Sequence, residues 1–356
     1  MKLNVNCPIN TVSYGYVSSF FIKYLKLLGY DLRHIPIGQN SPDENLMSHI
    51  NDVISRWDFH FDAPCLKIWH QDNLNSFTGS GEKIGFPIFE LEDFKDQEKH
   101  NLKYPDRLFV CSEWAKQTVK NNGIDTPTHV VPLGYDHEIF KPCPLRNSDN
   151  ETVVFANFGK FEIRKGHDIL IEAFNQAFDK KDDVALIMMP HNYFLTPQEW
   201  NDWINKYKKS KLGDKVQIIN RLKNQKMVYS IMKQCHCGVF PAKAEGWNLE
   251  ALEMLAIGKH IIITNCTGHT EFCNDDNSML IEMDSGYEKA VDNKFFFGQG
   301  RWNIFAQKQK DQLIYHMRDF YKRFRNGEVL ENKADVEQFT WQNSALKLDK
   351  AIKNRG

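Results

Sequence analysis

The segment from Cys237 to Gly258 constrains the fold of this chain more than any other. The apolar run Cys237-Gly-Val-Phe240 predicts a buried strand, and apolar residues at helical spacing follow it, namely Leu249, Leu252, Leu255 and Ala256. The intervening Gly246-Trp-Asn248 therefore predicts a strand-to-helix turn whose backbone N–H groups point out of the helix start. Such a helix start binds phosphate through free N–H donors and the helix dipole.

Two carboxylates flank this predicted turn at a spacing of eight residues. Glu253, one turn into the helix, is placed to accept two hydrogen bonds from a vicinal diol such as ribose. Glu245, before the turn, is placed to hold hydroxyl groups on the other side of the phosphates. A diphosphate between two polyols describes a nucleotide-sugar. The spacing alone leaves open a surface helix with two solvated glutamates.

The N-terminal part predicts a parallel sheet. A strand at Leu3–Cys7 is followed by a loop at Pro8–Gly15, apolar residues at helical spacing from Val17 to Leu28, and a strand at Asp31–Pro36. Ligands of parallel sheets lie beyond the carboxyl ends of the strands. We therefore expect the loop that ends in Ser13-Tyr-Gly15 to face a ligand.

Composition bounds the class of protein. The chain has 356 residues, enough for two domains, and its 42% hydrophobic and 26% charged residues are typical of a globular protein. A net charge of −1 gives no global attraction to nucleic acid or membrane. No apolar stretch of about 18 residues and no apolar N-terminal leader occur, so we expect a cytoplasmic protein without a transmembrane segment.

The chain lacks the usual signatures of a metal site. Cys235-His-Cys237 is the closest cysteine pair among eight cysteines, and no second ligand pair has zinc spacing. Asp-x-Asp, the manganese-binding signature of GT-A transferases, is absent from the sequence. We expect no metal and no cofactor other than a nucleotide-diphosphate sugar as co-substrate.

A cluster of cations precedes the next predicted helix. Lys160, Arg164 and Lys165 lie close to Gly159, which lets the backbone approach a ligand. Negative charge that develops on a departing diphosphate requires groups of this kind. A solvated loop is the alternative reading of the cluster.

These and other motifs resemble the retaining GT-B glycosyltransferases of family four, the glycosyl transferases group 1. The resemblance covers nearly the whole chain in the right order. It is carried by Glu245-x7-Glu253, Gly258, Thr264–Glu271, Asn157–Gly166, Ile84–Glu90, Val110–Trp114, Val130–Asp136 with Phe140 and Pro142, Lys294–Phe297 with Trp302, and Phe339–Trp341.

The resemblance implies an α/β fold of the GT-B type, in which two Rossmann-like domains with parallel sheets face each other across a cleft. It implies an acceptor domain at residues 1–145, a nucleotide-sugar domain at 151–330, and a C-terminal helix at 335–356 that packs back on the first domain. Lys141–Asn150, a proline-containing polar run, is the predicted linker.

The resemblance also assigns roles to individual residues. It implies catalytic roles for Glu245, Lys165 and His70, and places Glu253 and Arg221 at the nucleotide ribose and base. On the acceptor side it implies Ser13, Tyr14, Gly15, Asp72 and Glu90. The donor diphosphate would be bound by Gly159, Lys160, Arg164, Lys165, Gly246, Trp247, Asn248, Leu249, Gly268, His269 and Thr270. The family usually has Arg at Lys160 and Gly at Asn248.

The implied activity is metal-independent transfer of a sugar, with retention, from a nucleotide-diphosphate sugar to an acceptor hydroxyl. The acceptor remains open among a glycan, a lipid-linked sugar and a modified base in DNA, as in phage-type transferases. A catalytically silent nucleotide-sugar-binding protein is the alternative of a different class. Residues 294–325 carry an excess charge of +6, which leaves open a peripheral contact with anionic lipid or DNA.

Overall fold

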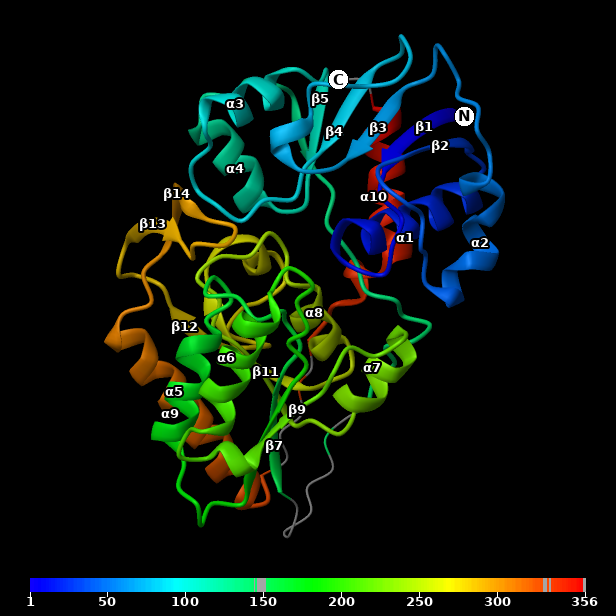
Figure 1. Cartoon of the computed structure of the whole chain (residues 1–356). Helices are drawn as coiled ribbons and strands as arrows, with labels where there is room; N and C mark the ends of the chain where they lie inside the picture. The colour runs from blue at the N-terminus through cyan, green and yellow to red at the C-terminus, as the bar shows by residue number, and fades with distance from the viewer. Residues whose placement is uncertain (144, 146–151, 329–331, 333, 355–356) are drawn as a thin grey trace. The chain divides into compact units, whose positions relative to one another are not determined.

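The computed structural model of the chain describes residues 1–143, 145, 152–328, 332 and 334–354. It divides into two compact units, Met1–Asp136 with Glu337–Gly356, and His137–Val336 (Figure 1). Most of the predicted linker at Lys141–Asn150 lies outside the described residues. Among helices formed by the described residues, none combines the length and apolar character that crossing a bilayer requires.

The first unit is built on a six-stranded parallel sheet with the order β2-β1-β3-β4-β5-β6. The first pair runs in register from Lys2 opposite Asp31 to Cys7 opposite Pro36. The strands are β1 (Lys2–Cys7), β2 (Asp31–Pro36), β3 (Cys65–Ile68), β4 (Lys83–Phe86), β5 (Arg107–Val110) and β6 (Thr128–Val130). The helices are α1 (Ser13–Leu27), α2 (Glu44–Ile54), α3 (Asp96–Lys103), α4 (Glu113–Asn121) and α10 (Trp341–Lys353), with short 3-10 turns η1 (Gln71–Asn73) and η4 (Glu337–Phe339).

The second unit has the same kind of sheet, with the order β12-β11-β10-β7-β8-β9. Its strands are β7 (Val153–Asn157), β8 (Val184–Met188), β9 (Val216–Ile218), β10 (Cys237–Phe240), β11 (His260–Asn265) and β12 (Met279–Glu282), and an antiparallel hairpin of β13 (Tyr287–Val291) and β14 (Phe297–Asn303) is added. Its helices are α5 (His167–Ala177), α6 (Pro197–Lys208), α7 (Gln225–Met232), α8 (Leu249–Ala256) and α9 (Gln307–Arg325), with 3-10 turns η2 (Gly213–Lys215) and η3 (Thr267–Glu271). The predicted pair of parallel α/β sheets is confirmed.

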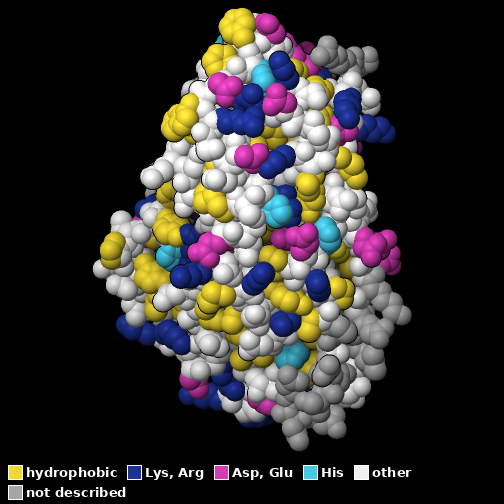
Figure 2. All heavy atoms as spheres, turned by 90° about the vertical axis from the view of Figure 1, so that its right-hand side faces the viewer, with side chains coloured by type: hydrophobic (Ala, Val, Ile, Leu, Met, Phe, Trp, Pro, Cys, Tyr) yellow, Lys and Arg dark blue, Asp and Glu magenta, His cyan; other side chains and the backbone are white. Residues whose placement is uncertain are grey.

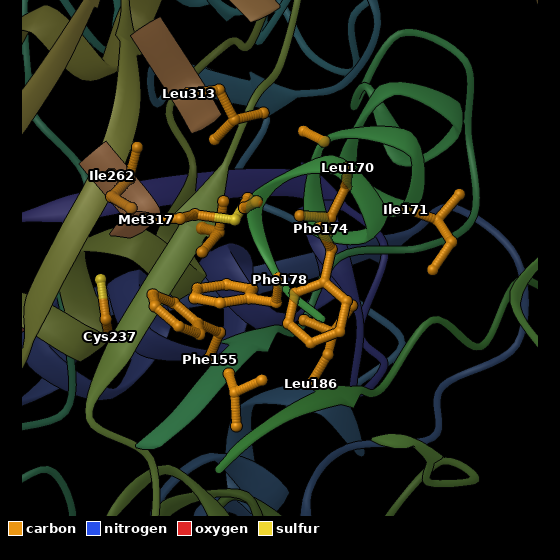
Figure 3. Packing of buried hydrophobic residues seen from close by; sticks show 14 of the residues in the cluster. Phe155, Leu170, Ile171, Phe174, Phe178, Leu186, Cys237, Ile262, Leu313 and Met317 are labelled. Atoms are coloured by element: carbon orange, nitrogen blue, oxygen red, sulfur yellow. The ribbon is translucent and has the colours of Figure 1, made fainter. Parts of the chain in front are cut away.

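The core of the second unit lies between its sheet and the helices that cover it. Phe155, Phe174 and Phe178 meet there with Leu313 and Met317 of α9 (Figure 3). Burial of large apolar side chains of this kind is the main favourable contribution to folding. On the face shown in Figure 2, Lys and Arg side chains alternate with Asp and Glu, in line with the near-zero net charge.

Helix α10 belongs to the first unit although it is last in the chain. Trp341 is fully buried there, its ring stacked on Phe20 with centroids 5.0 Å apart. At the other end of the helix, the Arg107 guanidinium donates to the carbonyls of Ala351 (2.6 Å), Ile352 (3.2 Å) and Asn354 (3.0 Å). These carbonyls lack partners within a helix, so Arg107 closes its C-terminus. The expected C-terminal helix is confirmed.

One predicted loop is wrong in part. The sequence predicted a loop through Gly15, but α1 already begins at Ser13, whose φ is 44°. A Cβ on Gly15 would lie 2.4 Å from the backbone nitrogen of Asn10. Gly15 therefore permits a close approach between the first helical turn and the preceding chain, which is a packing requirement.

Candidate active site in the second unit

The site is organised by the turn from β10 to α8. Asn248 adopts a left-handed conformation (φ 79°, ψ 73°), and its Oδ1 accepts a hydrogen bond from the backbone N–H of Ala251 at 3.2 Å. Asn248 therefore caps α8 with its side chain in a conformation that asparagine tolerates better than most residues. The predicted strand-to-helix turn is confirmed.

The segment after β11 holds this turn in place. The backbone N–H of Glu245 donates to Thr267 Oγ1 at 2.9 Å, and the N–H of Gly268 donates to the carbonyl of Glu245 at 2.9 Å. A Cβ on Gly268 would lie 2.0 Å from the carbonyl oxygen of Gly246. His269 is fully buried, and its Nε2 contacts the carbonyl of Thr264. The two segments expected at the diphosphate, the turn before α8 and the start of η3, are thus hydrogen-bonded to each other.

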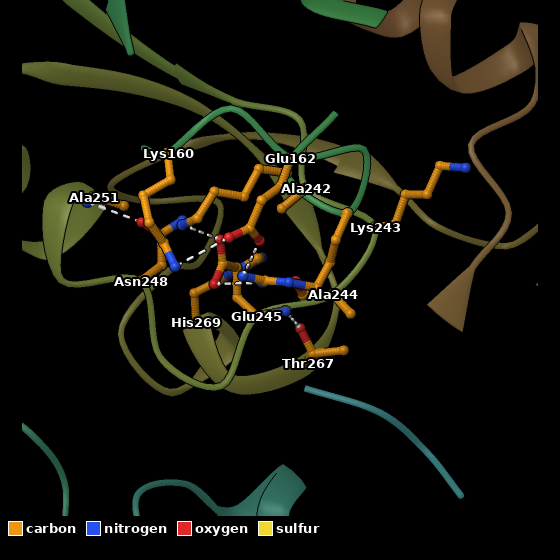
Figure 4. A network of polar contacts seen from close by, with 12 residues as sticks. Lys160, Glu162, Ala242, Lys243, Ala244, Glu245, Asn248, Ala251, Thr267 and His269 are labelled. Carbon is orange, nitrogen blue, oxygen red and sulfur yellow. Dashed lines mark hydrogen bonds and ion pairs between the residues drawn. The ribbon is translucent and has the colours of Figure 1, made fainter. Parts of the chain in front are cut away.

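Glu245 lies at the centre of a buried network of charges (Figure 4). Its Oε1 accepts from Lys165 Nζ at 2.6 Å and its Oε2 from Arg164 Nη1 at 2.8 Å. Arg164 also donates to the carbonyl of Ala244 at 2.6 Å and to Glu162 Oε2 at 2.8 Å. Lys160 completes the network with an ion pair to Glu162 Oε1 at 3.0 Å. Three cations therefore face two carboxylates.

Burial and ion pairing shift the pKa values of Glu245 and Lys165 in opposite directions. Burial raises the pKa of Glu245, but the charges of Arg164 and Lys165 and their hydrogen bonds outweigh it, so the pKa lies well below its usual range. Burial lowers the pKa of Lys165, but Glu245 and other carboxylates raise it above its ordinary value. Glu245 is thus held as a carboxylate and Lys165 as an ammonium ion.

A pocket of about 10 Å³, room for about one water molecule, opens at this pair. It is lined by Asn157, Gly159, Lys165, Phe240, Ala242, Glu245 and Asn248. Asn157 Oδ1 accepts from the Gly159 N–H at 2.8 Å and contacts His167 Nε2 at 3.0 Å. A Cβ on Gly159 would approach Lys165 Cδ to 2.9 Å, so the glycine makes room for the lysine.

Lys160 differs from its two neighbouring cations because its side chain is 42% exposed. Its Nζ lies 5.8 Å from the ring centroid of Phe194 and 6.0 Å from that of Phe295, and the two rings are in edge contact at 5.3 Å. Phe295 lies in the turn between β13 and β14. The sequence did not predict this hairpin, which supplies one of the rings under the lysine.

Two residues expected at the nucleoside lie elsewhere in the unit. Glu253 is 4% exposed inside α8, and Arg221 follows β9 with its guanidinium 5.0 Å from the ring centroid of Tyr193. Neither is among the residues that line the pocket. Their roles at ribose and base stay predictions. Thr270 follows Thr267 in η3 and donates to its carbonyl at 2.7 Å, while Trp247 packs on Phe272 with centroids 5.1 Å apart.

The candidate acceptor residues gather in the first unit. The Tyr14 hydroxyl donates to the carbonyl of Ile88 at 2.5 Å and accepts from its N–H at 3.0 Å. The Tyr14 ring contacts the exposed His70 ring at 4.6 Å. Burial raises the pKa of Tyr14, and the nearby charges of Glu90 and Asp72 raise it further. The structure therefore brings four of the predicted residues together, with Ser13 and Gly15 in the adjacent turn of α1.

Sequence reasoning missed Glu162 and Asn157. Glu162 is 6% exposed and binds Arg164 and Lys160, so it orients the cations of the cluster. The alternation Lys160-x-Glu162-x-Arg164 was a signal that could have indicated it, since residues two apart in an extended loop lie on the same side. No cluster of three or more His, Cys, Asp or Glu side chains suited to a metal ion occurs within the ranges the structure describes.

The second unit is similar in sequence to known proteins. Residues 144–292, all in the second unit, match the model of the family described as "Glycosyl transferases group 1". The matched range is less than half of the chain and contains the turn from β10 to α8 and the cations before α5. It is 24% identical over 265 residues to an uncharacterized glycosyltransferase of Methanocaldococcus jannaschii, which covers 67% of this chain and 63% of that relative.

Solved structures with the same fold match almost the whole of this chain. Sucrose-phosphate synthase from Thermosynechococcus elongatus matches with a TM-score of 0.66 and 13% identity over 99% of this chain and 98% of that one. The HepE protein of Anabaena, solved in complex with UDP-glucose, matches with a TM-score of 0.65 and 14% identity over 99% of both chains. The predicted GT-B fold is confirmed.

Proposed function

We propose that this protein transfers a sugar, with retention and without a metal ion, from a nucleotide-diphosphate sugar to an acceptor hydroxyl. The observation that carries the proposal is the buried ion pair between Lys165 and Glu245, at 2.6 Å. Both side chains line the pocket before α8, and Gly159 lines it too. A fixed ammonium group beside backbone donors suits a diphosphate that gains charge as it leaves. Glu245, kept ionised, suits the hydroxyl groups of the sugar.

In the proposed reaction, the bond between the anomeric carbon and the β-phosphate oxygen breaks as the acceptor oxygen attacks from the same face. The acceptor proton passes to the departing phosphate, and the nucleoside diphosphate leaves. No protein nucleophile is needed in this scheme. The contribution of the protein is orientation of both substrates and charge stabilisation by Lys165.

Arg164 and Glu162 have a supporting role in this proposal. Arg164 is 4% exposed and donates to two carboxylates and one carbonyl, so it fixes the carboxylate of Glu245. Lys160, being more exposed, remains the candidate for a direct contact with the outer phosphate. In this proposal Arg164 positions Glu245, whereas Lys160 and Lys165 bind the phosphates.

For the acceptor we propose a hydroxyl-rich molecule that does not carry a phosphate backbone. Tyr14 and His70 offer ring surfaces that suit a sugar, and Asp72 and Glu90 nearby suit its hydroxyl groups. Two carboxylates at this position would repel the backbone of DNA. Of the acceptors considered, a glycan fits these side chains better than a modified base in duplex DNA.

The donor is tested first by thermal shift with UDP-, GDP- and ADP-sugars, each with and without a chelator. A ligand that binds the native state raises the melting temperature. UDP-glucose is the first choice because HepE of Anabaena was solved with it. We expect a shift with one nucleotide that the chelator leaves unchanged and that Glu253→Ala abolishes.

Catalysis is tested by donor hydrolysis and transfer assays on variants. Glu245→Gln and Lys165→Ala should each reduce transfer by about 10²-fold or more, the usual loss when a charge-stabilising group is removed. Lys180→Ala removes an exposed lysine outside the site and serves as the control. Full transfer by a folded Lys165→Ala variant would refute the mechanism. A wild-type protein that binds donor but shows no turnover would favour a silent binding protein.

A further inference from the structure

A second concave site lies in the first unit, between α4, β6 and α10. It is a groove of about 660 Å³ lined by Lys116, His129, Val130, Lys347, Lys350, Ala351, Lys353 and Asn354. Its volume is within the range of small-molecule sites. Four of its eight lining residues are lysines and none is acidic, so the groove has a single sign of charge.

The lysines of α10 lie on one face of the helix. Lys347, Lys350 and Lys353 are spaced three residues apart, and like charges at this spacing destabilise a helix. Within the described part of the chain, Lys353 is the one of these three with a carboxylate partner, Asp349 at 2.7 Å. The last-turn cations interact favourably with the dipole of the helix. That effect accounts for Lys350 and Lys353, and Lys347 Nζ lies 5.6 Å from the ring centroid of Phe339, but neither interaction involves Lys116 on α4.

Lys116 and Lys350 are exposed, and neither side chain makes an ion pair with any residue in the described part of the chain. His129 lies beside them on β6, and its pKa is lowered by burial and further by the charges of Arg107 and Lys116. Burial is the larger of these causes, so the positive character of the groove follows from its four lysines and the lack of acidic residues in its lining. The groove therefore attracts anions at neutral pH.

The lysines are presented by a rigid frame. Trp341 fixes one end of α10 by stacking on Phe20, and Arg107 binds three carbonyls at the other end. Asp349 accepts from the Tyr30 hydroxyl at 2.7 Å. Because the helix is already fixed, ligand binding has to order only the lysine side chains and not the backbone that carries them.

The lining distinguishes between kinds of anion. Val130 and Ala351 are its only apolar lining side chains, no Phe, Tyr or Trp is among its lining residues, and its one ring is the imidazole of His129, which packs against Phe109. A single-stranded nucleic acid needs aromatic rings for stacking, and a membrane surface needs an apolar face to insert. Phosphate oxygens need only the ammonium donors that are present.

We propose that this groove binds a small anion that carries two or more phosphate groups. Lys116 and Lys350 bind it from opposite walls, and Lys347 and Lys353 neutralise its remaining charge. The site is separate from the proposed donor pocket, which lies in the other unit and depends on Lys165. It gives the protein a second site that a phosphorylated metabolite occupies independently of the sugar donor.

The test is calorimetric titration of the full chain with inorganic tripolyphosphate, without metal, at low ionic strength. Wild type is compared with Lys116→Gln/Lys350→Gln, with the control Lys180→Gln/Lys322→Gln, which removes two exposed lysines elsewhere, and with Lys165→Ala. We expect the groove double variant to bind at least tenfold more weakly, and the other two variants to bind as wild type does. Circular dichroism checks that each variant is folded.

Several outcomes would overturn this proposal. Absence of binding by wild type would do so, as would equal weakening in the control double variant, which indicates a non-specific effect of charge. Loss of binding in Lys165→Ala alone would place the anion in the donor pocket. Binding to vesicles of anionic phospholipid without binding to tripolyphosphate would assign the lysines to a membrane. The Lys165→Ala variant measures anion binding without the proposed donor pocket. The titration can therefore be interpreted even if the proposed transferase function is wrong.

Discussion

At the scale of single residues, the site depends on close approaches of backbone that only glycine permits. Gly166 precedes α5 and follows Lys165, with φ at 70°. A Cβ there would lie 2.0 Å from the carbonyl oxygen of Pro241. The chain beside β10 and the chain that carries Lys165 thus meet at a position without space for a side chain. This contact sets the distance between the lysine and the turn that bears Glu245.

The stability cost of this close contact at Gly166 can be measured separately from the cost of its positive φ. Gly123 also has φ at 70°, but a Cβ there would meet nothing within 4 Å. We expect Gly123→Ala to lower the free energy of unfolding by about 1 kcal/mol, the cost of a left-handed alanine. Gly166→Ala should add the cost of overpacking, about 1–3 kcal/mol more. Urea unfolding measures both, and equal losses would contradict the argument.

At the scale of elements, ion pairs compensate much of the positive charge of the basic segment 294–325. Six of its eight cations pair with carboxylates in the structure: Lys294 with Glu199, Lys308 with Asp284, Lys310 with Glu172, Arg318 with Asp182, Arg323 with Glu328 and Arg325 with Asp183. All six of these partners lie outside the segment, so its excess charge of +6 is largely compensated by folding. These ion pairs favour a structural role for the cations over binding to lipid or DNA.

Helix α10 is the element that joins the end of the chain to the first unit. Trp341 packs on Phe20 at 5.0 Å and Phe21 at 5.6 Å, and it is fully buried. We expect Trp341→Ala to destabilise the first unit by about 3–5 kcal/mol, as truncation of a buried aromatic side chain does. Amide hydrogen exchange should show faster exchange in β1 and α1 and unchanged protection in β7 and β10. Equal loss in both units would mean that α10 stabilises more than the unit it packs on.

At the scale of the whole molecule, buried histidines couple stability to pH. Burial lowers the pKa of both His167 and His269 to about 4 from the ordinary histidine value of 6.5. Between these pH values the unfolded chain binds more protons than the folded one, so stability rises with pH across this window and is lost as the solution is acidified. Each histidine contributes about 3 kcal/mol over the full shift, at about 1.4 kcal/mol for each pKa unit.

Free energies of unfolding in urea, measured from pH 4.5 to 6.5, test this coupling. His269→Gln keeps a donor for the Thr264 carbonyl and removes the titrating ring, so the slope should fall by about 1.4 kcal/mol per pH unit. His49→Gln, which removes an exposed imidazole, is the matched control. An unchanged slope in His269→Gln would show that this ring does not titrate in the window.

Much of the architecture could be predicted because it depends on local patterns. Apolar runs and helical spacing located β1, β2, β10 and the turn before α8, because each of these patterns lies within a short stretch of sequence. The β13–β14 hairpin was not predicted, since its strands carry polar and glycine residues such as Gly298 and Gly300. Its formation depends on what it packs against.

The sequence by itself determined the parallel α/β class, the turn between β10 and α8, and the set of charged residues at the candidate site. Only the tertiary structure decided which of those charges face each other. Lys165 and Glu245 are 80 residues apart, and the pair at 2.6 Å exists because neighbouring strands bring their carboxyl ends to one edge of the sheet. The same holds for the groove between α4 and α10. Spacing along the chain is a local property, whereas the partner of a charge depends on contacts between distant segments.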